Sequence, residues 1–272
     1  MFGENLLINI NDSLSTLQNK NLHLSIEKFT YAGHRKYTFT GGTPYKESYI
    51  SKESMIKTSL FLILSQYLAY KYVLQPGWWF GEEEPFRYET GSYAKLADKI
   101  GHAYSGYLLS NLNTDLLFSS GLSWNKATLY GGLISFIQMF QLEYKDGVAP
   151  EYGFSKYDIY SNTTGILYYY LQHHIPFFQN FTPKYLYNYQ KLIQHTKEVP
   201  VAIVENYEEI TFFMSINVKN LLPNNYKKFW LNGLDLALGY RVKGFNVIDV
   251  STRYALRENY YFGLDLNILS IL

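Results

Sequence analysis

Residues 208–218, EEITFFMSINV, decide the fold class of this chain. Every second residue is apolar, namely Ile210, Phe212, Met214, Ile216 and Val218. The residues between them are mostly polar. Because successive side chains of a strand point to opposite faces, this alternation predicts a β-strand with one buried face.

The same two-residue period returns before the C-terminus, in residues 234–240, 245–257 and 260–268. The joins between these runs are short and contain turn residues such as Lys243-Gly244, which is typical of hairpins. Four strands are too few to close a membrane barrel, since the smallest have about eight. We therefore expect an antiparallel meander that packs on the helices or on another protein.

Helix-length segments precede the strands, at residues 54–74, 91–111, 124–142 and 157–174. Ser123 stands at the N-cap position of the third segment, and Pro176 ends the fourth. The Gly131-Gly132 pair would allow close contact between helices. Thr182-Pro183 is expected to start a further short helix.

The chain is expected to divide into three regions. Residues 1–50 are polar and weakly patterned, and we expect them to form an N-terminal extension. Residues 51–200 are expected to form a helical domain, and residues 201–272 an antiparallel β region packed on it. The expected fold class is α+β, a helical bundle followed by a small antiparallel β meander.

The most apolar helix candidate, residues 54–74, is compatible with two environments. Residues 60–64 are apolar without interruption, and the segment is long enough for a membrane span. Lys57 and Lys71 interrupt it, which favours a buried core helix. The alternative is a membrane-inserted helix, and with it contact between this protein and a membrane.

The composition excludes several classes of function. The 24 basic and 23 acidic residues leave a net charge of +1, so no nucleic acid is expected as a partner. The absence of cysteine excludes thiol catalysis, disulfides and a lipid-accepting Cys. Residues 1–20 show no basic and apolar regions of a signal peptide, so we expect either that such a segment has been removed or that the start of the chain is misplaced. The 28 tyrosines favour interfaces, pore walls and membrane boundaries.

Polar residues near the helix ends form a candidate site. Asp98 and His102 have the i, i+4 spacing that places two side chains on one helix face, and so do Asp158 and Asn162. If the helices form a bundle, these ends can converge. The candidate residues are Asp98, Lys99, His102, Glu143, Asp146, Asp158 and Asn162.

The candidate site has three possible interpretations. Carboxylates and an imidazole can bind a divalent metal or share proton transfer. They can also form a hydrogen-bonded network that fixes the register of the helices. The sequence lacks a His-Glu-x-x-His motif, a nucleophile elbow, a P-loop and an EF-hand loop. We therefore predict no catalytic residue and no cofactor, and leave metal binding open. His173 and His174 are expected at the surface or at the helix C-terminus.

Motifs in a fixed order resemble a known family, the YfiM-like family of uncharacterised predicted periplasmic lipoproteins (domain of unknown function 2279). The motifs are Trp78-Trp79, DKIGHA at 98–103, EYKDG at 143–147, and GFSKYD at 153–158 with Asn162 and Gly165. The tail is similar to the longer members in Asn206-Tyr207, Leu222-Pro223 and Leu238-Gly239-Tyr240. The similarity runs from about Tyr70 to near the C-terminus, with a more distant resemblance to VanZ-like envelope proteins.

The resemblance implies a location in the periplasm or at the periplasmic face of the outer membrane. Chains of this kind also resemble the plug of the type 9 secretion translocon of the Bacteroidota. The family has no established enzymatic activity, so the resemblance implies no catalytic role. Its members are usually described as lipoproteins, and this chain departs from them in having no Cys.

We therefore expect a non-enzymatic interaction protein that caps or plugs the periplasmic side of a large outer-membrane pore. Its expected partner is a large outer-membrane translocon protein, and the chain is not an obvious homo-oligomer. Tyr-rich surfaces of low net charge suit a reversible protein interface. The alternative is an envelope enzyme or lipid-modifying protein that uses Asp98, His102, Glu143 and Asp158.

Overall fold

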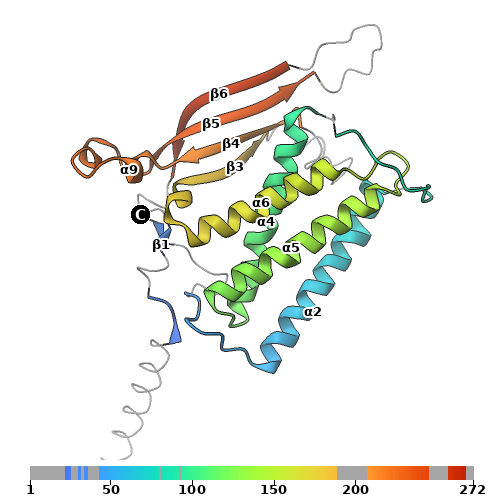
Figure 1. Cartoon of the computed structure of the whole chain (residues 1–272), viewed down its shortest axis with the longest axis horizontal. Coiled ribbons are helices and arrows are strands. Elements are labelled where there is room, and N and C mark those ends of the chain that lie inside the picture. Colours follow the sequence, from blue (N-terminus) through green and yellow to red (C-terminus); the bar gives the residue numbers. More distant parts are fainter. Residues whose placement is uncertain are drawn as a thin grey trace, which may run out of the picture.

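The computed structural model describes residues 22–25, 30–31, 34–35, 43–79, 81–91, 94–188, 207–244 and 257–267. It confirms the α+β fold, with a helical bundle followed by an antiparallel sheet (Figure 1). The helices are α2 (Lys52–Ala69) with its continuations η2 (Tyr70–Leu74) and α3 (Gln75–Gly77), α4 (Leu96–Ser119), α5 (Trp124–Asp146) and α6 (Lys156–His174). The sheet contains β3 (Phe181–Tyr187), β4 (Ile210–Ile216), β5 (Leu234–Lys243) and β6 (Arg257–Leu266). Shorter elements are β1 (Thr30–Tyr31), β2 (His34–Arg35), η3 (Pro176–Asn180), α9 (Val218–Leu221) and η4 (Lys227–Phe229).

Serine residues begin three of the helices. Ser51 caps α2 by accepting a hydrogen bond from the backbone N–H of Ser54. Ser123 is the N-cap residue of α5, as predicted. Ser155 caps α6 by accepting from the backbone N–H of Asp158, which fixes the first turn of that helix.

Glycines let the helix backbones approach closely. A Cβ on Gly165 of α6 would lie 1.7 Å from the carbonyl oxygen of Ala103 on α4. A Cβ on Gly131 of α5 would lie 2.2 Å from Oγ1 of Thr114 on α4, which confirms the close contact predicted for the glycine pair. The contact at Gly165 holds α4 and α6 together beside two candidate site residues, since Ala103 directly follows His102 and Gly165 lies three residues after Asn162.

The interior of the bundle is rich in small and polar side chains. Buried residues that illustrate this are Ser110, Asn113 and Thr114 of α4, Thr128, Ser135 and Glu143 of α5, and Asn162 and Gln172 of α6. The outer side of α5 carries exposed Leu133, Phe136, Ile137 and Phe140. This arrangement of small and polar residues inside and large apolar residues outside is typical of helices in apolar surroundings.

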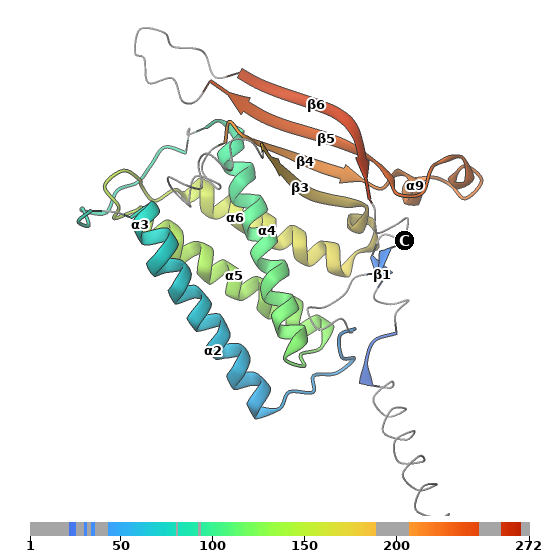
Figure 2. The ribbon, with the colours of Figure 1, turned by 180° about the vertical axis from the view of Figure 1, so that it is seen from behind.

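The prediction that residues 54–74 form a buried core helix is wrong, because no residue of α2, η2 or α3 is buried. Figures 1 and 2 show α2 beside α5, on the side of the bundle away from the sheet. It contacts the bundle through long or terminal side chains, for example Gln66 with Gln138 at 2.6 Å. Within the described residues, no helix combines the length and hydropathy that a membrane crossing requires.

The sheet is fully antiparallel in the order β3-β4-β5-β6, as a meander predicts. The short helix predicted at Thr182-Pro183 is wrong, since both residues lie in β3. Pro183 is tolerated because β3 is an edge strand, where a proline interrupts little of the ladder. A strand was also predicted at residues 245–257. Its residues 245–256 lie outside the described residues, and its last residue, Arg257, begins β6.

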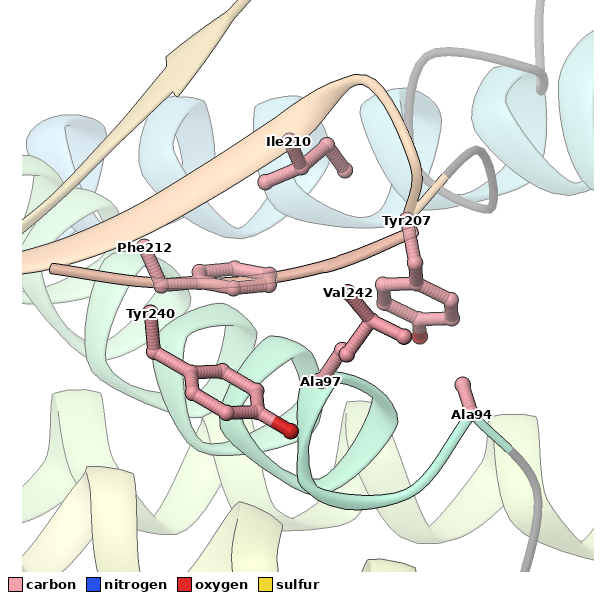
Figure 3. Close-up of a cluster of buried hydrophobic side chains, with 7 residues drawn as sticks. All are labelled: Ala94, Ala97, Tyr207, Ile210, Phe212, Tyr240 and Val242. Atoms are coloured by element: carbon pink, nitrogen blue, oxygen red, sulfur yellow. The ribbon is translucent and has the colours of Figure 1, made fainter. Parts of the chain in front are cut away.

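The sheet packs on the first turns of α4. Figure 3 shows Phe212 and Tyr240 of the sheet, with Val242, lying toward Ala97. Tyr207 joins this core just before β4. The apolar contact fixes the sheet next to the helix end that carries Asp98.

Candidate functional site

Three helices bring charged side chains together at one end of the bundle. Lys99 of α4 lies at the centre, with its Nζ 2.6 Å from Oδ2 of Asp98 and 2.5 Å from Oδ1 of Asp158. It is also 3.6 Å from Oε1 of Glu89, in the segment before α4. The ammonium group therefore links α4 to α6 and to that segment.

His102 lies one turn along α4 and joins the third helix to the group. Its Nδ1 is 3.1 Å from Oε1 of Glu143 and 3.3 Å from Oδ1 of Asn162. Its Nε2 is 3.5 Å from Oδ1 of Asp98 and 3.7 Å from Oδ2 of Asp158. Asn162 also donates from Nδ2 to Oε1 of Glu143 at 3.0 Å. We call Asp98, Lys99, His102, Glu143, Asp158 and Asn162 the polar network.

The network lies largely out of water, and its charges stabilise one another. Burial alone would lower the pKa of His102, but hydrogen bonds with Asp98 and Glu143 and nearby negative charge hold it well above its usual value. Burial disfavours ionised Asp98, yet His102 and Lys99 lower the pKa of this carboxyl. Burial raises the pKa of the Glu143 carboxyl, since this residue is only 1% exposed. The carboxyl groups around His102 therefore favour its protonated, imidazolium form.

The structure brings six of the seven candidate residues into this network and separates the seventh. Asp146 accepts a hydrogen bond from the indole Nε1 of Trp79 at 2.6 Å instead. Sequence reasoning missed Tyr207, whose hydroxyl donates to Oδ1 of Asp98 at 2.9 Å. It also missed Glu89. Tyr207 belongs to a tail motif of the family resemblance, whereas no sequence pattern points to Glu89.

Three residues of the polar network lie close enough together to be considered as metal ligands. Asp98, His102 and Asp158 offer ligand atoms that lie within 4.8 Å of one another. However, the ammonium of Lys99 already lies between the two carboxylates. A divalent ion would have to displace this ammonium. The arrangement therefore fits a charge-balanced network better than a metal centre.

Of the two placements predicted for His173 and His174, the helix C-terminus is confirmed, since both lie in the last turn of α6. A surface position is wrong for His173, which is only 4% exposed. Its ring lies 5.0 Å from that of Trp124 at the start of α5 and 4.0 Å from that of Tyr169. Nε2 of His174 lies 3.0 Å from Oγ1 of Thr128. Both histidines pack where the end of α6 meets the start of α5, away from the polar network.

A cavity of about 910 Å³ lies beside the network, between α2 and the pair α4 and α5. Asp98, His102, Glu143 and Asp158 form part of its wall, with Tyr207 from the sheet side. This volume falls in the range of sites for small molecules. The network is therefore accessible from a space large enough for a ligand.

Residues 79–174 match the model of a family described as predicted periplasmic lipoprotein (DUF2279). The match covers about a third of the chain, from Trp79 to the end of α6, and contains all seven candidate residues. It supports the family resemblance, and its description confirms the predicted periplasmic location. No curated protein and no solved structure matches this chain.

Proposed function

We propose that this protein is a non-enzymatic interaction protein of the cell envelope that caps the periplasmic side of a large outer-membrane protein-translocation pore. The observation that carries the proposal is a large exposed apolar surface on the helical bundle. We call it the outer face, and it consists of Leu60, Ile63 and Leu64 of α2 and Leu133, Phe136, Ile137 and Phe140 of α5. Large apolar side chains exposed on neighbouring helices are typical of an interaction site.

The polar network supports the same proposal. A body that closes a wide pore must keep its shape while it binds and leaves. Lys99 and His102 tie α4, α5 and α6 together through charged hydrogen bonds that are sheltered from water. The network thus gives the bundle one fixed arrangement without requiring any reaction.

The composition of the surface suits a contact that can be released. The chain carries a net charge of +1, so a strong electrostatic clamp on the partner is not expected. Exposed tyrosines, including Tyr67, Tyr130 and Tyr144, lie on the same helices as the outer face. Tyrosine combines an apolar ring with a polar tip and is enriched in protein interfaces.

The test is the permeability of cells that lack this protein. We expect the deletion strain to take up an antibiotic that the outer membrane normally excludes by size, with the partner still present at normal abundance. Wild-type protein should restore exclusion. Ile137→Glu should fail to do so, because a charge in the middle of the outer face is costly to bury. Unchanged uptake in the deletion strain would contradict the proposal.

A matched variant separates the outer face from the rest of the surface. Phe229 lies in η4, outside the bundle, and is 74% exposed, compared with 64% for Ile137. Phe229→Glu makes a similar apolar-to-acidic change at an exposed position. It should restore exclusion as well as the wild type does.

A second candidate function is favoured by the cavity beside the polar network. An envelope enzyme or lipid-modifying protein would use Asp98, His102, Glu143 and Asp158, which all line that cavity. Metal analysis of the purified protein separates the two candidates. A stoichiometric divalent metal that is lost in Asp158→Asn would favour the enzyme. We expect no such metal, because Lys99 already provides the cation between Asp98 and Asp158.

A further inference from the structure

The cavity between α2 and the bundle exists because α2 packs loosely. The side chains of Ser54 and Gln66 form hydrogen bonds with the bundle, to the carbonyl of Ser120 and to the side chain of Gln138. No residue of α2 is buried. The space of about 910 Å³ behind α2 is lined by residues of α2, α4 and α5 and is partly open to solvent. A concave space of this size between helices is typical of a ligand site.

One part of the cavity wall is apolar. Ala69 and Leu74 contribute from the α2 side, Leu108 and Leu109 from α4, and Met139 and Leu142 from α5. These side chains carry no hydrogen-bonding groups apart from the weakly accepting thioether of Met139. A hydrocarbon chain is the ligand group that such a wall stabilises, through removal of apolar surface from water.

Another part of the wall is acidic and aromatic. Six carboxyl groups line the cavity, from Glu89, Asp98, Glu143, Asp146, Glu151 and Asp158. They outnumber Arg87 and His102 on the same wall, together with the adjacent Lys99. Rings of Trp78, Trp79 and Tyr88 lie along the same lining. Carboxylates and aromatic faces both attract cations, and an ammonium group satisfies both.

Trp78 adds an unused hydrogen-bond donor. Its indole Nε1 is buried and has no hydrogen-bond partner within the described residues. A buried donor without an acceptor costs free energy. An oxygen atom of a ligand would remove this cost by accepting a hydrogen bond from the indole N–H. The ligand should therefore carry an oxygen in its head group near the ammonium.

We propose that this cavity binds a single-chain lipid whose head group carries an ammonium and a neighbouring oxygen. The chain lies against Leu109 and Met139, and the ammonium lies toward the carboxyl groups outside the polar network, such as Glu151. This inference is independent of the capping function, because the outer face is formed by other side chains of the helices.

Calorimetric titration of the purified full-length chain tests the proposal. The probes are lysophosphatidylethanolamine, lysophosphatidylglycerol with the same acyl chain, and free ethanolamine, all below micelle-forming concentrations. We expect the first probe to bind at least tenfold more tightly than the second, and ethanolamine not to bind. Equal or tighter binding of lysophosphatidylglycerol would overturn the assignment of the head group. If free ethanolamine bound with the same affinity as lysophosphatidylethanolamine, the assignment of a lipid would be overturned.

Two variants place the ligand within the cavity. Leu109→Trp fills it and should weaken binding of lysophosphatidylethanolamine at least tenfold. Leu112→Trp is the matched control, since Leu112 is on α4, is 41% exposed and does not line the cavity. Wild-type affinity in a folded Leu109→Trp protein would overturn the proposal.

A third variant decides the outcome if Leu109→Trp does not fold. Glu151→Gln removes an exposed carboxyl group at the cavity wall without touching the polar network. It should reduce the preference for lysophosphatidylethanolamine over lysophosphatidylglycerol severalfold. An unchanged preference would show that the carboxyl groups do not select the head group, contrary to the proposal.

Discussion

The substitution Gly165→Ala tests whether close contact between helix backbones holds the polar network together. The added Cβ would lie 1.7 Å from the carbonyl oxygen of Ala103 and 3.0 Å from the backbone nitrogen of Tyr107. Both are backbone atoms, so no side-chain rotation relieves the overlap. Overpacking of this kind costs typically about 1–3 kcal/mol, and occasionally more. Alanine offsets about 1 kcal/mol of this by its higher helix propensity.

We therefore expect Gly165→Ala to lower the free energy of unfolding by about 2 kcal/mol, because the overlap with backbone belongs at the upper end of the overpacking range. The measurement is urea unfolding followed by circular dichroism. Gly132→Ala on α5 is the matched control, since its Cβ would meet Cγ2 of the Ile166 side chain at 3.2 Å. That side chain can shift, so this variant should be about as stable as the wild type. Wild-type stability of Gly165→Ala would refute the reasoning.

Other predictions concern the polar network. His102→Ala should lower the free energy of unfolding by about 1–3 kcal/mol, because it leaves buried Glu143 without its charged partner. An unchanged melting temperature together with lost activity or metal content would favour the enzyme. The pKa of His102 is raised on folding, so its contribution to stability is fully present below about pH 6.5 and is lost as pH rises through the folded value. The free energy of unfolding, measured at several pH values, should fall in this way in the wild type. In His102→Gln it should change less with pH. If the free energy of unfolding falls to the same extent in His102→Gln, a group other than His102 causes the pH dependence. Tyr207→Phe should cost about 1 kcal/mol in urea unfolding by removing the hydrogen bond to Asp98, and no loss would show that this bond contributes nothing.

Local sequence patterns predicted those parts of the structure that local interactions determine. The alternation in residues 208–218 gave β4, since a strand with one buried face requires that period. The spacing of Asp98 and His102 placed both side chains on one face of α4, where the structure has them. The spacing rules predict convergence of the polar helix ends only if the helices form a bundle, and α4, α5 and α6 do form one.

The remaining features depend on contacts that a local pattern does not contain. Tyr207 is 109 residues from Asp98, so no spacing rule could pair them. β3 was mistaken for a helix start because Pro183 is common at both helix starts and edge strands. The apolar residues 60–64 of α2 predict burial, but whether the core of this chain covers them depends on the packing of the other helices, and the structure leaves α2 unburied.

We propose that the outer face contacts a large outer-membrane pore. The most direct test is photo-crosslinking in living cells with a photoreactive amino acid at position 137 of α5. The same probe at position 229 of η4 serves as the control. We expect position 137 to form a high-mass adduct containing an outer-membrane translocation protein and position 229 to form none. Folded protein that forms no adduct with such a partner from position 137 would contradict the claim.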